Sequence, residues 1–138
     1  MKNVWKGSYT YFDDEENESK PIGFEIHAEL VSGSFHGKVS EEEFTKLTGD
    51  KATVKGFVEN DFISFVKTYP YAWWIEDEQY WINKELPGHD CNYRGFYSEA
   101  DQEWSGEWEV ITEKGRIGNY QEEFEAIVLT GSWKMKQV

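Results

Sequence analysis

Alternation of apolar and polar residues with a period of two is the feature that most constrains this chain. The stretch IGFEIHAEL, residues 22–30, places its apolar side chains on one face and Glu25, His27 and Glu29 on the other. A strand with one buried face has this period, whereas an amphipathic helix repeats every 3.6 residues. No long segment shows the helical period, so we expect an all-β fold.

Eight segments of this kind follow one another at roughly even spacing. They cover residues 4–12, 22–30, 35–39, 51–60, 61–74, 92–99, 103–114 and 124–136. A single antiparallel up-and-down β-barrel over residues 1–138 accounts for their number and short connections, because its last strand pairs with its first and leaves no edge. Residues 40–50 are the candidate for one short helix, with Ser40 as its cap and Gly49 at its end.

A glycine flanked by two bulky residues recurs in the predicted strands. The motifs are WKGSY, FHGKV, VKGFV, YRGFY and WSGEW, centred on Gly7, Gly37, Gly56, Gly95 and Gly106. Each motif places its glycine between two large side chains on the same face of a strand. Glycine weakens a strand, so its repeated use indicates bends or close approaches that help a curved sheet to close.

The charge of the chain limits its partners. The formal net charge is −13, and such a surface repels phosphate groups, so we expect neither nucleic-acid nor membrane binding. The excess of acid favours solubility or a basic protein partner. Cys91 is the single cysteine, which excludes an internal disulfide, and the first 18 residues lack the apolar core of a signal peptide. We therefore expect a cytoplasmic protein.

The sequence contains no recognisable catalytic or metal-binding constellation. His89, Asp90 and Cys91 are adjacent in PGHDC, and neighbouring residues of an extended loop point in different directions. His27 and His36 share faces with polar residues, as exposed histidines do. The acidic runs DDEENE, SEEE and EDE lack the spacing of a calcium loop and are interpreted as solvated loops. We expect no enzyme, no cofactor and no metal site.

Lys67 is an unusual residue for its position, because ISFVKTY puts it in phase with Ile63, Phe65 and Tyr69. If that face is inside the barrel, the ammonium group must be paired or neutralised. Three hypotheses follow. Lys67 contacts an anionic group of a ligand, it pairs internally with a carboxylate or a tyrosine hydroxyl, or the opposite face of the strand turns inward and Lys67 lies on the surface.

Aromatic residues in phase with the motif glycines suit the wall of a pocket, because ring faces take the apolar part of a ligand and hydroxyl groups orient the polar part. The alternative is that they fill a solid core. The candidate ligand-binding residues are Phe65, Lys67, Tyr69, Tyr93, Tyr97, Trp104 and Trp108.

The motifs WKGSY, ISFVKTY, YRGFY, WSGEW and GSWKM, taken in order from Trp5 to Met135, resemble small, largely uncharacterised β-barrel domains of the calycin type, which includes lipocalin-like and avidin-like barrels. The resemblance implies a small apolar or amphipathic ligand in the barrel. Two departures accompany it. The chain has Trp5-x-Gly7 where lipocalins have Gly-x-Trp, and the polar ring that binds biotin in avidin-like proteins is not identifiable, so biotin binding is not inferred.

The alternative function is an acidic protein-binding module, such as an immunity or inhibitor protein that covers a basic partner. Electrostatic complementarity would speed that encounter. An exposed aromatic patch near Trp73, Trp74 and Trp81 would favour this alternative, whereas an open cavity near Lys67 would favour a small ligand.

Overall fold

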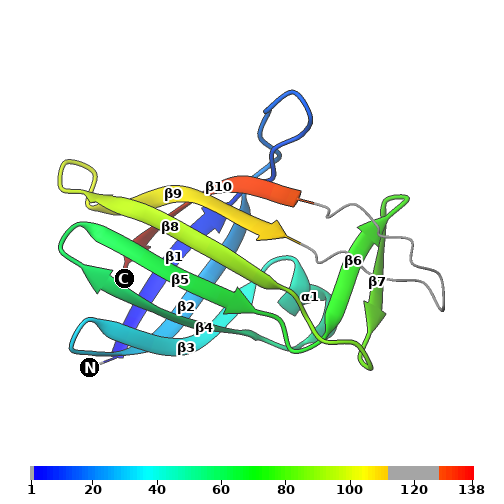
Figure 1. Cartoon of the computed structure of the whole chain (residues 1–138), viewed down its shortest axis with the longest axis horizontal. Coiled ribbons are helices and arrows are strands. Elements are labelled where there is room, and N and C mark those ends of the chain that lie inside the picture. The colour runs from blue at the N-terminus through cyan, green and yellow to red at the C-terminus, as the bar shows by residue number, and fades with distance from the viewer. Residues whose placement is uncertain (1, 112–127) are drawn as a thin grey trace, which may run out of the picture.

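The protein is an all-β domain in the computed structural model, which describes residues 2–111 and 128–138 (Figure 1). Within these ranges the chain forms ten strands and one short helix. They are β1 (Lys2–Tyr9), β2 (Ile22–Val31), β3 (Ser34–Glu41), α1 (Phe44–Thr48), β4 (Ala52–Glu59), β5 (Phe62–Thr68), β6 (Ala72–Glu76), β7 (Gln79–Asn83), β8 (Asp90–Ser98), β9 (Glu103–Ile111) and β10 (Val128–Gln137).

Eight strands close into an antiparallel barrel in the order β1-β10-β9-β8-β5-β4-β3-β2. β10 pairs with β1, with Trp5 opposite Gln137 and Tyr9 opposite Trp133. The predicted up-and-down barrel, closed by its first and last strands, is therefore confirmed. Each of the eight predicted segments contains a barrel strand, and residues 112–114 and 124–127 of two segments lie outside the described residues.

The segment 61–74 is interrupted at Pro70, where the sequence predicts either the end of a strand or a bulge, and the structure shows the end of a strand. β5 ends at Thr68, two residues before Pro70, and Trp73 and Trp74 belong to β6. Proline has no backbone N–H to donate to a ladder, which explains the break. β6 pairs with β7 in a hairpin inserted between β5 and β8. Figure 1 shows this hairpin standing at one end of the barrel, next to α1.

The barrel interior is filled at the end opposite the β6–β7 hairpin. The Trp5 and Phe35 rings meet there at 5.3 Å between centroids, and Ile63 and Met135 are almost completely buried. Burial of one such side chain contributes about 1.5–3 kcal/mol. Inward-facing residues alternate with outward-facing ones along the strands, as the period of two predicts.

The motif glycines allow strands to approach one another closely. Gly95 lies opposite Gly106 in the β8–β9 pair. A Cβ atom on Gly106 would lie 1.9 Å from the carbonyl oxygen of Arg94, and one on Gly95 would lie 2.7 Å from the Trp133 ring. Neither glycine has a positive φ. Close approach, rather than turn geometry, therefore explains the glycines of these two motifs.

Helix α1 ends as predicted but begins differently. Gly49 follows it in the left-handed conformation, with φ of 82°. Ser40 does not cap the helix, because β3 continues through Glu41 and the N-cap position is Glu43. Thr45 instead accepts a hydrogen bond from the Glu41 backbone N–H, at 3.0 Å. The prediction of a Ser40 cap is wrong, since the strand extends past the point where the helix was expected to begin.

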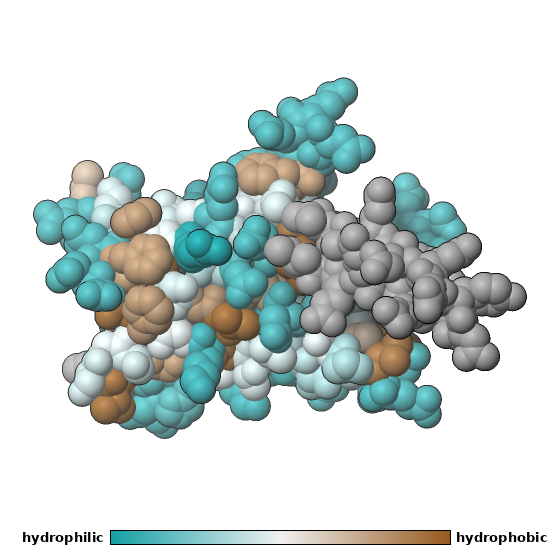
Figure 2. Space-filling model, viewed as in Figure 1, coloured by the Kyte–Doolittle hydropathy of each residue, from teal (hydrophilic) through white to brown (hydrophobic). Residues whose placement is uncertain are grey.

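The barrel face shown in Figure 2 carries hydrophilic side chains interspersed with near-neutral and hydrophobic ones. A hydrophobic patch crosses β4, β5 and β8, where the Phe62 ring contacts those of Phe57 and Phe96 at 6.0 and 5.4 Å. Arg94 lies on the outer face, and its guanidinium is 3.6 Å from the Glu109 carboxylate. Both groups are solvated, so the pair contributes little.

Histidines 27 and 36 also point outward, on β2 and β3. The His27 ring nitrogen lies 3.0 Å from the Glu25 carboxylate, so this histidine has a surface partner. No helix in the described part of the chain is both long enough and apolar enough to cross a membrane.

Candidate ligand-binding site

Lys67 points into the barrel, where it is 3% exposed. Its Nζ atom donates a hydrogen bond to Glu41 Oε2 at 3.0 Å and another to the Tyr93 hydroxyl at 2.9 Å. It also lies 4.4 Å from the centre of the Tyr9 ring, a contact that favours a cation. Internal pairing is therefore the arrangement found for Lys67, and the hypothesis of a surface lysine is wrong.

Glu41 links Lys67 to a second tyrosine. Its Oε1 atom accepts a hydrogen bond from the Tyr69 hydroxyl at 2.8 Å, and its side chain has no exposed surface. Burial by itself would lower the pKa of Lys67, but the negative charge of Glu41 and the neighbouring Tyr93 raise it above its ordinary value. Lys67 is thus a charged ammonium whose charge is balanced inside the barrel.

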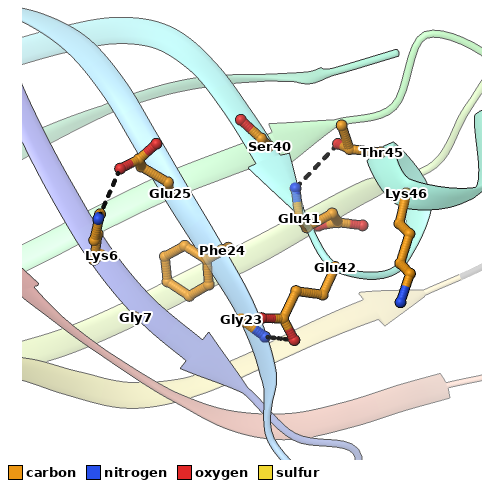
Figure 3. Close-up of a pocket in the computed structure, with 10 residues that line it drawn as sticks. All are labelled: Lys6, Gly7, Gly23, Phe24, Glu25, Ser40, Glu41, Glu42, Thr45 and Lys46. Carbon is orange, nitrogen blue, oxygen red and sulfur yellow. Dashed lines mark hydrogen bonds and ion pairs between the residues drawn. The ribbon is translucent and has the colours of Figure 1, made fainter. Parts of the chain in front are cut away.

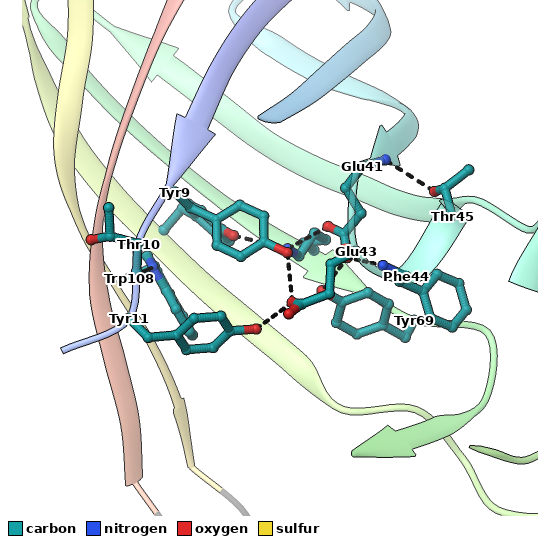
Figure 4. A network of polar contacts seen from close by, with 11 residues as sticks. Tyr9, Thr10, Tyr11, Glu41, Glu43, Phe44, Thr45, Tyr69 and Trp108 are labelled. Atoms are coloured by element: carbon teal, nitrogen blue, oxygen red, sulfur yellow. Dashed lines mark hydrogen bonds and ion pairs between the residues drawn. The ribbon is translucent and has the colours of Figure 1, made fainter. Parts of the chain in front are cut away.

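Glu43 forms a second carboxylate centre beside the first. The hydroxyl groups of Tyr9 and Tyr11 both donate to its Oε1 atom, and Figure 4 shows the two rings converging on it. Burial raises the pKa of Glu43, the two tyrosine hydrogen bonds lower it, and nearby Glu41 raises it, with a net upward shift. The ionised form of the Glu43 carboxyl group is therefore less favourable in this position than in water.

The two glutamates correct the sequence interpretation of SEEE as a solvated loop. Counted over the whole residue, backbone included, Glu41 is 4% exposed and Glu43 is 8% exposed. A signal for Glu41 was available, because Phe35, Gly37 and Val39 lie in the inward phase and Glu41 is the next residue in that phase. Glu43 had no such signal, since the chain has left the strand before reaching it.

A cavity of about 520 Å³ opens at the end of the barrel where the β6–β7 hairpin stands. Its lining includes the ends of β1, β5 and β9 and the beginnings of β8 and β10. The lining residues are Tyr9, Tyr11, Lys67, Tyr69, Trp73, Trp74, Ile75, Glu76, His89, Cys91, Trp108, Val110 and Leu129. The Lys67–Glu41 pair therefore lies next to an open space with aromatic walls.

Strand β6 supplies part of the cavity wall. Trp73 is buried, at 4% exposure, and its ring contacts those of Tyr69 at 5.3 Å and Phe44 at 5.8 Å. Of the three tryptophans whose exposure would favour a protein partner, Trp74 and Trp81 are exposed and Trp73 is not. Trp73 instead packs against Tyr69 of the barrel segment and Phe44 of α1, and so holds the hairpin in place.

A backbone contact fixes the opposite wall. The Trp108 indole N–H donates to the carbonyl oxygen of Thr10 at 2.8 Å, which orients the ring. Trp108 also meets the Tyr9 and Tyr11 rings edge-on, at 6.0 and 5.2 Å. These contacts hold three aromatic side chains of the wall in one arrangement.

The structure separates the seven predicted ligand-binding residues into three groups. Lys67, Tyr69 and Trp108 line the cavity. Phe65 and Tyr93 lie one layer deeper, stacked at 4.7 Å, and Tyr93 supports Lys67. The Tyr97 and Trp104 rings contact each other at 5.0 Å, but they lie at the opposite end of the barrel and do not line the cavity.

His89 and Cys91 both reach the cavity, because they are two residues apart along an extended segment. Burial and the charge of Lys67 lower the pKa of His89, so its imidazole is neutral at pH 7. Burial raises the pKa of Cys91 to about 11, so its thiol is protonated. The Cys91 thiol is therefore not in its nucleophilic thiolate form at neutral pH, whereas the neutral His89 imidazole is the form that accepts a proton.

A second hollow lies on the outside of the barrel, between β2 and α1 (Figure 3). Three of its charged side chains already have partners, since Lys6 is 3.5 Å from Glu25 and Glu42 accepts from the Gly23 backbone N–H at 3.2 Å. This hollow lies between the strand and the helix, and it lacks the several aromatic side chains that line the cavity inside the barrel.

Comparison with known proteins supports the fold. No protein-family model and no curated protein sequence matches the chain. Among solved structures, the crystal structure of a rhizavidin–biotin complex superposes with a TM-score of 0.57 and 13% sequence identity, covering 100% of this chain and 92% of rhizavidin. The domain thus has a closed β-barrel fold similar to that of rhizavidin. At this identity the likeness concerns the fold, and it lends no support to a basic protein partner.

Proposed function

We propose that this protein binds a small apolar or amphipathic molecule in the cavity at the β6–β7 end of the barrel. The cavity itself is the observation that carries the proposal. Its volume of about 520 Å³ falls in the range of about 300–1,000 Å³ that is usual for ligand pockets. The similar solved structure is a complex with a small molecule, which supports a ligand-binding role for a barrel of this shape.

The distribution of side chains suits an amphipathic ligand. Trp74, Ile75 and Leu129 provide apolar surface at the mouth, and Trp108 provides a ring in the wall. Polar atoms gather further inside, around Lys67. The apolar body of a ligand would lie between the rings, and its polar group would reach inward.

Binding rather than catalysis is proposed because the buried ionisable groups are engaged with one another. Lys67 is paired with Glu41, and Glu43 is held by two tyrosine hydroxyl groups. A general base or nucleophile needs a free and accessible atom near its substrate. Among the described residues of the cavity, the Cys91 thiol is protonated, and no hydrogen bond joins the His89 imidazole to a nucleophile.

Fluorescence titration with the neutral naphthalene dye prodan tests the proposal. The dye brightens and shifts to the blue in an apolar site, and we expect saturable binding of one dye per protein. Leu129→Trp narrows the mouth at a residue that is already 42% exposed. We expect this variant to weaken dye binding at least tenfold, which corresponds to about 1.4 kcal/mol.

Val31→Trp is the matched control, because Val31 is 62% exposed and lies at the far end of β2. It should bind the dye as the unmodified protein does. An absence of dye binding, together with no co-purified small molecule in native mass spectrometry, would overturn the proposal. Equal loss of binding in both variants would place the dye outside the cavity and would also count against it.

A further inference from the structure

We infer that the preferred ligand carries a positive charge, as a protonated or quaternary amine attached to an apolar body. The inference rests on the proposed function, because it concerns the same cavity. It follows from three observations: the engagement of Lys67, the excess of carboxylates around the cavity, and the aromatic character of its walls.

Lys67 is not available to hold an anion. Its Nζ atom already donates to Glu41 and Tyr93, at 3.0 and 2.9 Å, and it lies over the Tyr9 ring at 4.4 Å. The Lys67 charge is already balanced by Glu41, so a ligand carboxylate would either compete with Glu41 for the ammonium group or add an unbalanced negative charge beside it.

Carboxylates outnumber cations at the cavity among the described residues. Glu76 lies in the lining itself. Glu43 lies directly behind the wall, because it accepts hydrogen bonds from Tyr9 and Tyr11, which both line the cavity. Glu41 is paired with Lys67, whereas no ion pair joins Glu43 or Glu76 to a cation among the described residues. A further negative charge brought by a ligand would be repelled.

The wall is suited to a cation for a separate reason. Tyr11, Trp73, Trp74 and Trp108 all present rings to the cavity, and the negative face of an aromatic ring attracts ammonium groups. Tyrosine rings in this barrel already surround one ammonium, since Lys67 Nζ lies 4.4 and 5.0 Å from the Tyr9 and Tyr69 ring centres. Aromatic walls with nearby carboxylates are the usual surroundings of bound quaternary ammonium groups.

Three naphthalene ligands with the same ring and different charge test the inference. They are (2-naphthylmethyl)trimethylammonium, 2-naphthalenemethanol and 2-naphthoate, and each is titrated calorimetrically into the protein at low and moderate salt. We expect the ammonium compound to bind at least tenfold more tightly than the carboxylate, with the alcohol between them. The preference should weaken as salt rises, because Glu76 is solvated.

Two variants test separately how much Glu43 and Glu76 each contribute to binding of the ammonium compound. Glu76→Gln and Glu43→Gln should each reduce ammonium affinity at least threefold while leaving the affinity for the alcohol unchanged. Glu59→Gln, at an exposed site on β4, is the control and should change neither. Glu76→Gln and Glu43→Gln both keep the size of the side chain. Unchanged affinity for the alcohol would show that the cavity is intact in each variant.

The outcomes distinguish the inference from the proposed function. If the alcohol and the carboxylate bind as tightly as the ammonium compound, the inference is wrong and the proposed function stands. If the ammonium compound binds more tightly but both glutamine variants retain that preference, the assignment to these carboxylates is overturned. If none of the three ligands binds, the inference fails together with the cavity proposal.

Discussion

At the scale of single residues, the barrel interior is organised around Lys67 and two glutamates. Burying the Lys67 ammonium group would be costly without the Glu41 charge, and burying Glu41 would be costly without Lys67. Tyrosine hydroxyl groups complete the hydrogen bonding of both carboxylate centres. The inward phase of Lys67 could be predicted from ISFVKTY, but its partner could not be identified from that strand alone. The partner lies 26 residues away, on a strand that the sequence interpretation ended two residues too early.

Replacing Lys67 with methionine measures how much the buried Lys67–Glu41 ion pair contributes to the free energy of unfolding. Lys67→Met leaves the Glu41 carboxylate without its cation, so we expect the free energy of unfolding at pH 7 to fall by about 3–5 kcal/mol. The double variant Lys67→Met, Glu41→Gln removes both charges and should recover at least half of that loss. Urea unfolding followed by tryptophan fluorescence supplies the values. Equal stability of the single and double variants would show that the two charges do not depend on each other.

Glu43→Gln tests the cost of the second carboxylate through pH. Because the pKa of folded Glu43 lies above its ordinary value of 4.5, the folded state binds this proton more tightly than the unfolded state does. The contribution of Glu43 to the free energy of unfolding therefore decreases as pH rises through the window between the two pKa values. Glutamine does not titrate, so the stability of Glu43→Gln relative to the unmodified protein should increase across that window.

Unfolding curves at intervals from pH 4 to pH 8 check this expectation, with Glu59→Gln as the exposed control. The control should show no gain that depends on pH. A Glu43→Gln variant whose relative stability falls as pH rises would mean that the tyrosine hydrogen bonds stabilise the charged carboxylate more than burial destabilises it.

At the scale of the elements, alternation and glycine spacing explain most of the barrel. Period-two patterns predicted the barrel strands because each has one face inside and one outside. The β6–β7 hairpin is not predicted as a unit, since the sequence assigns Trp73 and Trp74 to the segment before them and residues 75–91 to a long loop with at most a short strand in QYWINKE. The hairpin is the element that completes the cavity, so the least predictable element is also the one that matters for the site.

The glycine pair of β8 and β9 provides a test at this scale. Gly106→Ala would place a Cβ atom 1.9 Å from the Arg94 carbonyl oxygen and 2.7 Å from the Gly95 Cα atom. These contacts are with backbone atoms, which cannot rotate away, so we expect a loss of about 1–3 kcal/mol or more in the free energy of unfolding.

Ser105→Ala is the matched control for Gly106→Ala, because it changes the neighbouring exposed residue of the same strand. It should alter stability by less than about 0.5 kcal/mol. If the two variants unfold at the same urea concentration, the strands do not approach as closely as described.

At the scale of the whole molecule, the closed barrel could be predicted and the cavity could not. Alternation states which side chains point inward, but not how far along the barrel each one lies. Tyr97 and Trp104 share the inward phase of Tyr93 and Trp108, yet they lie at the opposite end. Whether a barrel is solid or hollow depends on the summed volume of side chains from all strands and from the hairpin. That sum depends on register, which a single sequence does not reveal.

The central claim is that the cavity at the β6–β7 end binds a small molecule, and a crystal structure of the protein with prodan tests it most directly. We predict one dye molecule between Tyr69, Trp73 and Trp108, with Lys67 still paired to Glu41. Dye bound instead to the exterior patch of Phe57 and Phe96, with the cavity free of dye, would contradict it.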